Sequence, residues 1–268
     1  MKETAIADYA GYCGGMKKSL EDKMFFEDWL DGIAHVVDFG CADGALLTEL
    51  HERHPELTLT GIDANELMLK KIPIECGKVR NNLPVPDNRT RPAITALNLS
   101  SVLHEVYSYG SDDYIDMFWT NINQAKRYKY VFIRDMMYEP FVTPGTELMM
   151  LSKEEIEQLR QWSRNIYNFG DEKQIEDFEY YQGTLSCSKR NMVHFLLKYR
   201  YTQNWEREVK ENYLAVDKTE IFRRLSNYDC VYFNQYTMPF LHDRIKEDFD
   251  IDFNEMTHVK MVFKLREG

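Results

Sequence analysis

The stretch that decides the fold is Val36-Val37-Asp38-Phe39-Gly40-Cys41-Ala42-Asp43-Gly44. Its apolar start predicts a buried strand, and its glycines predict a tight turn that lets a ligand approach the backbone closely. Leu46, Leu47 and Leu50 then indicate a helix, whose first backbone N–H groups are free to meet a ligand. Strand, glycine-rich turn and helix in this order form the first half of a βαβ unit.

A second strand completes this unit and ends in an acid. It covers residues 57–62 and is followed by Asp63, whose carboxylate can accept hydrogen bonds from both hydroxyls of a ribose. The dinucleotide fingerprint G-x-G-x-x-G brings a pyrophosphate to the helix N-terminus. In this chain Asp38 stands two residues before Gly40, and a carboxylate there suits a cationic amine rather than a phosphate. A nicotinamide-dependent oxidoreductase is therefore disfavoured.

The pattern Asp38-x-Gly40-x-Ala42-x-Gly44 resembles motif I of the class I S-adenosylmethionine-dependent methyltransferases, which is an acid followed by three alternating glycines. Ala42 replaces the middle glycine. The resemblance implies that S-adenosylmethionine is the cofactor, with Asp38 facing its amine and Asp63 holding its ribose. The alternative is a Rossmann-like unit with a different cofactor or with none.

The resemblance covers about residues 30–140. Residues 82–87 are similar to the family's loop before the fourth strand, and residues 93–99 have the pattern of that strand. Residues 100–106 resemble the segment in which the chain passes under the sulfonium and turns into a helix. A fifth strand is expected at residues 130–133.

One position departs from the family's pattern. The family usually has an acid near the adenine amino group, where this chain has amides, so that Asn81 would have to make this contact. The resemblance implies that the cofactor-binding residues are Asp38, Gly40, Cys41, Ala42, Gly44, Asp63, Ala64, Asn81, Asn98 and Leu99. We expect the thiol of Cys41 to pack and to do no chemistry.

Methyl transfer is an in-line displacement, so the enzyme must mainly align the acceptor with the methyl group. His104 and Glu105 are the candidates for a catalytic base or an acceptor-orienting pair, since histidine titrates near neutral pH. The alternative is that His104 only caps or packs at the start of a helix. Arg134 and Asp135 at the end of the fifth strand are candidates for acceptor binding or for an ion pair. The resemblance implies that a segment before the first strand closes over the cofactor, for which Tyr9 or Tyr12 is a candidate, with plain packing as the alternative. Tyr12 is also a candidate for substrate binding.

The predicted fold class is α/β, with a Rossmann-like seven-stranded, mostly parallel sheet, helices on both faces and a mainly helical inserted lid. Residues 230–233 and 258–265 are expected to be the sixth and seventh strands. The expected units are 1–140 as the cofactor-binding core with an N-terminal helical segment, 141–217 as the lid that shapes the substrate region, and 218–268 as the C-terminal part of the core.

Periodicity and capping signals predict further helices. Capping boxes are expected at Ser152–Glu155 and at Asp217–Glu220. The expected helices cover residues 17–30, a stretch after Ser152, 191–199, 221–225 and 240–249.

Composition limits the class of protein and its surroundings. The chain has 268 residues, 44% of them hydrophobic, which is ordinary for a soluble globular protein. Its five cysteines are odd in number and include no Cys-x-x-Cys, which argues against a disulfide framework and against a zinc site. No metal is therefore expected. The N-terminal residues show no signal peptide and no apolar run could span a membrane, so a cytoplasmic location is expected.

The net charge of −11 opposes generic binding to nucleic acid, and a small or medium-sized molecule is the favoured acceptor. Residues 186–224, however, hold nine Lys and Arg against five acids, with aromatic residues among them. That segment leaves methylation of RNA or a nucleotide as an alternative. A non-catalytic cofactor-binding or regulatory protein is the alternative from another class.

Overall fold

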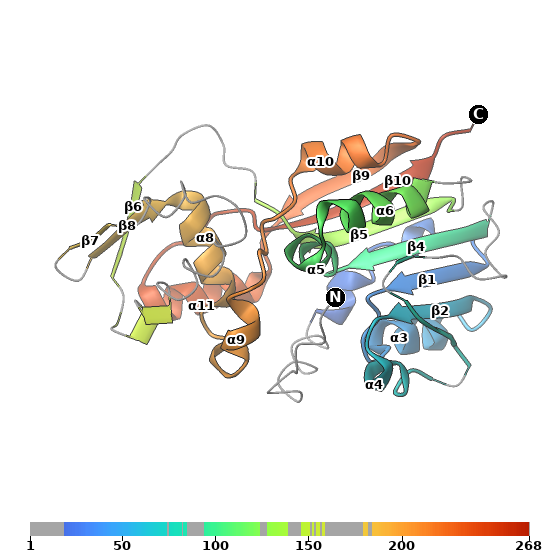
Figure 1. The fold of residues 1–268 in the computed structure, drawn as a ribbon, viewed down its shortest axis with the longest axis horizontal. Coiled ribbons are helices and arrows are strands. Elements are labelled where there is room, and N and C mark those ends of the chain that lie inside the picture. Colours follow the sequence, from blue (N-terminus) through green and yellow to red (C-terminus); the bar gives the residue numbers. More distant parts are fainter. Residues whose placement is uncertain are drawn as a thin grey trace.

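The computed structural model describes residues 19–73, 75–81, 83–84, 94–123, 128–138, 146–150, 152, 154–155, 157–158, 179–181 and 184–267. The strands of its main sheet are β1 (His35–Phe39), β2 (Thr58–Asp63), β3 (Gly77–Arg80), β4 (Thr95–Ser100), β5 (Tyr130–Met136), β9 (Tyr228–Tyr236) and β10 (His258–Leu265). Their order across the sheet is β3-β2-β1-β4-β5-β10-β9 (Figure 1).

The first five strands of this sheet run parallel, while β10 runs antiparallel to both of its neighbours, β5 and β9. Strand β1 has β2 on one side and β4 on the other, so the strand order reverses at β1. Ligands of open α/β sheets bind outside the carboxyl ends of the strands at this switch point. The predicted Rossmann-like, seven-stranded and mostly parallel sheet is confirmed.

Helices cover both faces of the sheet, as predicted. They are α3 (Ala45–Arg53), α4 (Glu66–Leu69), α5 (Leu103–Tyr109), α6 (Asp112–Asn123) and α10 (Lys218–Arg224). Successive side chains of a strand point to opposite faces. Val37 of β1 therefore packs with Trp119 of α6 on one face, while Val36 packs with Leu47 of α3 on the other.

The segment before β1 is less helical than predicted. Its described part contains only the short helix α2 (Leu20–Lys23) and the single 3-10 turn η1 (Glu27–Trp29). Phe26, which lies between them, is fully buried and stacks on Phe132 of β5 with 4.6 Å between the ring centroids. Burial of this aromatic ring fixes the chain locally and overrides the helical pattern.

The region that follows β5 builds a second lobe with a core of its own. It includes the strands β6 (Thr146–Met150), β7 (Glu179–Tyr181) and β8 (Thr184–Ser188), the helices α8 (Lys189–Lys198) and α9 (Trp205–Glu208), and the 3-10 turn η5 (Thr202–Asn204). The three strands form a small antiparallel sheet, β6-β8-β7, which the sequence analysis did not predict. Strands of three to five residues are too short to show a clear period.

The second core also includes α11 (Pro239–Phe249), which lies between β9 and β10 in the sequence. Phe195 and Leu196 of α8 share this core with Leu241 and Ile245 of α11. Figure 1 shows α8, α9 and α11 gathered together at one end of the molecule, away from β1 and β2. Two separate stretches of sequence therefore build this lobe.

The predicted capping box at Ser152 forms in full, and of the one at Asp217 the structure shows the side-chain cap. Glu155 accepts a hydrogen bond from the amide of Ser152, and the hydroxyl of Ser152 accepts one from the amide of Glu155 at 3.2 Å. The carboxylate of Asp217 accepts a hydrogen bond from the amide of Glu220 at 2.8 Å at the start of α10. Helices are found at the predicted positions around 191–199, 221–225 and 240–249.

Cys41, Cys76 and Cys230 are free thiols. Among the described residues, no helix has both the length and the apolar character that crossing a bilayer requires.

Candidate active site

The turn after β1 has the backbone geometry that its glycines allow. Gly40, Ala42 and Gly44 all have positive φ angles, of 75°, 46° and 80°. A Cβ atom added to Gly40 would lie 2.5 Å from Cγ2 of Val102, so this position tolerates only glycine. Ala42 adopts the left-handed conformation at a cost of about 1–2 kcal/mol, so replacement of the family's middle glycine leaves the turn intact.

Asp63 ties the end of β2 to this turn. One carboxylate oxygen, Oδ2, accepts the amide hydrogen of Ala42 at 2.9 Å, and the other accepts that of Asn65 at 2.7 Å. Burial raises the pKa of Asp63, although these two amides act in the opposite direction. The backbone carbonyl of Asp63 also accepts the amide hydrogen of Asn81 at 3.1 Å. Strand pairing therefore brings Asp63, the adjoining Ala64 and Asn81 together at one edge.

Asp38 is the second acid of this edge and is buried at the end of β1. Asn98 of β4 donates a hydrogen bond to Oδ1 of Asp38 at 2.7 Å and accepts one from the hydroxyl of Ser100 at 3.0 Å. Burial raises the pKa of Asp38 to about 6, against the lowering effect of Asn98 and Lys23. Within the described residues, Oδ2 of Asp38 has no hydrogen-bond partner. A buried carboxylate with one free oxygen fits the ammonium group of an amino acid.

Lys23 is a candidate that the sequence analysis missed. Burial and the charge of Arg134 lower the pKa of this lysine to about 8, while Asp38, Asp135 and Asp43 favour its charged form. Its ammonium therefore lies within electrostatic reach of the acids at the carboxyl ends of β1 and β5. No motif marks this position, since a lysine in a short helix is usually a solvated surface residue.

Two of the expected cofactor contacts offer little side-chain chemistry. Leu99 is fully buried in the core, so only its backbone can face a ligand. Cys41 is buried, and burial with the charges of Asp38 and Asp63 holds the pKa of its thiol well above the ordinary range. The prediction that Cys41 packs is confirmed, because a neutral buried thiol is inert.

Asp135 organises the start of α5. Its Oδ2 accepts the amide hydrogens of Val102 at 3.0 Å, Leu103 at 2.7 Å and His104 at 3.3 Å. Its Oδ1 pairs with Nδ1 of His104 at 2.8 Å and accepts the amide hydrogen of Met136. Both oxygens are thus engaged by the protein itself, and they fix the helix start and the imidazole ring together.

His104 is buried with its second ring nitrogen turned toward the insertion. Burial lowers the pKa of His104, but Asp135, Glu211 and Glu105 outweigh it and raise this pKa to about 9. In the free protein at neutral pH the imidazole is therefore cationic and cannot accept a further proton. Its Nε2 lies 4.0 Å from Oε2 of Glu211.

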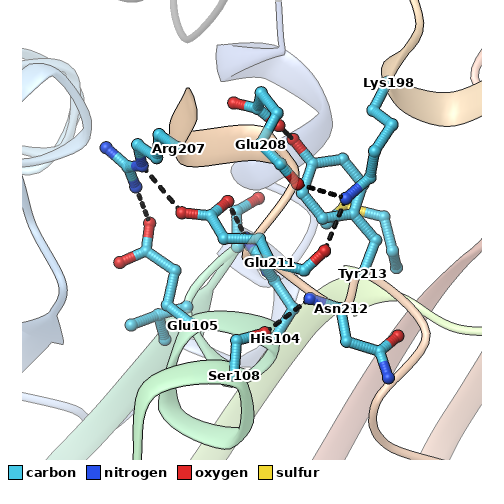
Figure 2. Close-up of polar contacts among 12 residues, drawn as sticks. His104, Glu105, Ser108, Lys198, Arg207, Glu208, Glu211, Asn212 and Tyr213 are labelled. Atoms are coloured by element: carbon cyan, nitrogen blue, oxygen red, sulfur yellow. Dashed lines mark hydrogen bonds and ion pairs between the residues drawn. The ribbon is translucent and has the colours of Figure 1, made fainter. Parts of the chain in front are cut away.

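A network of charged groups surrounds His104 (Figure 2). Arg207 donates to Oε1 of Glu105 at 2.5 Å and to Oε1 of Glu211 at 2.7 Å. Tyr109 also donates to Oε1 of Glu211, at 2.9 Å. Burial raises the pKa of Glu105 toward neutral pH, although Arg207 opposes this shift. Arg207 and Glu211 come from the insertion and were missed by the sequence analysis, because no local pattern connects them with His104.

The remaining substrate candidates are engaged elsewhere or lie outside the described residues. Arg134 is 4% exposed and donates to Asp22 at 2.8 Å and to the hydroxyl of Ser101 at 2.9 Å, which fastens α2 to the sheet. Tyr9 and Tyr12 lie outside the described residues. Of the predicted substrate residues, the structure thus brings Arg134 and Asp135 to the site's edge with their polar groups already paired.

The basic segment 186–224 is largely neutralised within the protein. Arg200 pairs with Asp248 at 2.5 Å, and Arg224 pairs with Glu220 at 2.6 Å. Lys198 is fully buried and donates to backbone carbonyls. The aromatic residues of α8 fill the second core. These contacts favour the interpretation of this segment as a packed helical region over that of a nucleic-acid surface.

The order of the strands identifies the fold, because one antiparallel strand, β10, lies between β5 and β9 at the end of an otherwise parallel sheet order. The fold is that of the class I methyltransferases. No protein-family model matches the sequence, and no curated protein matches it.

Methyltransferases are among the solved structures to which this chain is similar. The Burkholderia thailandensis 1,6-didemethyltoxoflavin-N1-methyltransferase is 11% identical, with a TM-score of 0.48, covering 100% of this chain and 93% of the other. An S-adenosylmethionine-dependent methyltransferase from Mesorhizobium loti is 14% identical, with a TM-score of 0.46 and coverages of 86% and 90%. Geranyl diphosphate C-methyltransferase from Streptomyces coelicolor A3(2) is 10% identical, with a TM-score of 0.45 and coverages of 92% and 79%.

Proposed function

We propose that this protein is an S-adenosylmethionine-dependent methyltransferase that modifies a small or medium-sized molecule. The observation that carries the proposal is the pair of acids at the switch point of a class I methyltransferase sheet. Asp38 is buried, and among the described residues one of its oxygens has no hydrogen-bond partner; Asp63 is anchored by the amides of Ala42 and Asn65. Buried acids at the carboxyl ends of adjacent strands, at the switch point of an open α/β sheet, are typical of functional sites.

Each cofactor group has a matching partner at this edge. Asp38 would bind the ammonium of the methionine part, and Lys23, which faces the same acids, would bind its carboxylate. Asp63 would accept the ribose hydroxyls with the lone pairs that its two amide contacts leave free. Asn81, next to Asp63, would contact the adenine amino group through its side chain.

When bound, the cofactor supplies an activated methyl group on a sulfonium. The chain's own residues then have to orient the acceptor and exclude water. His104, held by Asp135, would donate a hydrogen bond to an acceptor oxygen, because the free protein keeps it protonated. Glu105, with a pKa raised by burial, is the better placed of the two to accept the acceptor's proton. Asp135 acts as a positioning residue.

The alternative acceptors have less support. RNA or a nucleotide would need free cations along 186–224, and the pairing of Arg200, Arg207 and Arg224 inside the protein argues against that. A non-catalytic cofactor-binding protein would bind the cofactor but transfer no methyl group to any acceptor.

The test is isothermal titration of the full chain with S-adenosylmethionine, S-adenosylhomocysteine and NAD in the presence of a chelator. We expect the first two ligands to bind in the micromolar range and NAD not to bind. Asp38→Ala and Asp63→Ala should each abolish binding, while Glu52→Gln, an exposed acid on α3, should leave it unchanged. Absence of binding by the wild-type protein would overturn the proposal. Binding would justify screening metabolite extracts and bulk tRNA as acceptors.

A further inference from the structure

One imidazole and two carboxylates converge between α5 and the chain that follows α9. His104, Glu105 and Glu211 each offer one ligand atom, and these atoms lie within 4.8 Å of one another. Nε2 of His104 and Oε2 of Glu211 are 4.0 Å apart, too far for a hydrogen bond. Two atoms that share one metal ion at roughly 2.1 Å each lie about 3–4 Å apart. The spacing of His104 and Glu211 therefore suits an ion between them better than a direct contact, and Glu105 offers a third oxygen within 4.8 Å of both.

The surrounding contacts hold each side chain in a ligand-like orientation. Asp135 accepts from Nδ1 of His104 at 2.8 Å, which leaves Nε2 as the free nitrogen and fixes the plane of the ring. Such a carboxylate–histidine pair is the usual outer support of a metal-binding histidine. The side chain of His104 is 8% exposed, and its Nε2 has no hydrogen-bond partner among the described residues.

Arg207 does not fill the position between the three side chains. It binds Oε1 of Glu105 and Oε1 of Glu211, and therefore braces both carboxylates from one side. Each carboxylate keeps its second oxygen for another partner. Figure 2 shows Arg207 reaching the side chains of Glu105 and Glu211, while Lys198 reaches the backbone carbonyl of Glu211.

The charge of the cluster favours a cation. Among the described residues, Glu105 and Glu211 both form their ion pair with a guanidinium to the same side chain, Arg207. Two carboxylates that share one guanidinium leave negative charge in a largely buried cluster, and uncompensated buried charge is costly. A bound cation would offset that charge.

We propose that His104, Glu105 and Glu211 bind a divalent cation at the acceptor side of the site. A mixed set of one imidazole and two carboxylates suits Mn²⁺, Co²⁺ or Zn²⁺. No metal was expected from the sequence, where only the cysteine pattern was considered. Roughly a hundred residues of chain separate Glu211 from the other two ligands, so no local motif connects them. Three protein ligands leave positions open for a substrate.

The consequence for the substrate rests on the proposed function. An acceptor with a hydroxyl beside a second oxygen would bind the cation through both oxygens, and the cation would lower the pKa of the hydroxyl. In that state His104 and Glu105 act as ligands and take no proton from the acceptor, so the cation provides the activation in their place.

The test uses Mn²⁺ alone and the full-length protein after treatment with a chelator. Loss of the free Mn²⁺ signal in electron paramagnetic resonance measures binding, and we expect one site per chain that fills below about 1 mM. Pulsed measurements should show coupling to an imidazole nitrogen, which His104→Gln removes. Glu105→Gln and Glu211→Gln should each weaken Mn²⁺ binding at least about ten-fold.

Glu208→Gln is the matched control, since it removes the same charge from the same cluster but none of the three ligands. It should keep the wild-type affinity for Mn²⁺ within about three-fold. Failure of the wild-type protein to retain Mn²⁺, or retention without nitrogen coupling, would overturn the proposal whether or not the variants fold. Titration of the cofactor in the presence of a chelator tests the proposed function, whereas Mn²⁺ binding tests the metal site. Either proposal can therefore fail while the other holds.

Discussion

Replacing Asp38 by Asn should stabilise the fold while it destroys the cofactor site. Burial raises the pKa of Asp38 from 3.8 to about 6. A shift of about 2 pKa units corresponds to about 3 kcal/mol of free energy of unfolding that is present below pH 4 and is lost as the pH rises through 6. A neutral Asn avoids this loss, and its oxygen can still accept the hydrogen bond that Asn98 donates at 2.7 Å.

We therefore expect Asp38→Asn to raise the free energy of unfolding by about 2–3 kcal/mol near pH 7.5, and the melting temperature by about 5–10 °C. Affinity for S-adenosylmethionine should fall about 30-fold or more, because the ammonium loses its buried partner. Urea unfolding measures the first effect and isothermal titration measures the second. Glu52→Gln removes a charge from the surface and should change neither quantity.

The pH dependence makes this prediction specific. Near pH 5 the wild-type carboxyl is mostly protonated in the fold, so the stability difference between variant and wild type should shrink to about half of its value near pH 7.5. A variant that is less stable than the wild type near pH 7.5 would refute the reasoning. So would a stability difference that does not change with pH, since it would then come from packing and not from the buried charge.

Two further substitutions test the elements that hold the site. Asp22→Ala leaves the buried Arg134 without its carboxylate and should cost about 3 kcal/mol in urea unfolding. Arg134 and Lys260 hold the pKa of Asp22 below its usual range despite burial. The stability advantage of the wild type should therefore be lost as the pH falls below the pKa of an ordinary aspartate and through the lowered pKa of Asp22. A cost below about 1 kcal/mol would contradict the importance of this pair. Gly40→Ala should cost about 2 kcal/mol or more in thermal or urea unfolding, because φ is 75° and the new Cβ would meet Val102. Adding Val102→Ala should recover part of that loss, and strictly additive costs would show that the close contact is not its cause.

The arrangement of the proposed cofactor residues could be predicted from the sequence because its determinants are local. Gly40 and Gly44 specify a turn, Asp38 and Asp63 end two adjacent strands, and parallel strands place their carboxyl ends at one edge. Once the strand, turn and helix were recognised, the fold fixed the proximity of these residues without any knowledge of long-range packing.

The acceptor half could not be predicted in the same way. Glu211 approaches His104, and Arg207 pairs with Glu105, only because the insertion folds back over α5; no spacing rule connects residues so far apart. The pKa values of His104 and Glu105 likewise depend on burial and on these distant charges. The sequence indicated His104 and Glu105 as candidates, but it could not show which of the two side chains would hold a proton.

The second core also limits how this protein can be re-engineered. Its apolar contacts join α8, from the insertion, to α11, which lies between the last two strands of the sheet. Excision of residues 141–217 alone would expose Leu241 and Ile245, which are buried against that insertion. A chimera that exchanges this lobe with that of another protein of the same fold would therefore have to transplant α11 together with the insertion, as one unit encoded in two places.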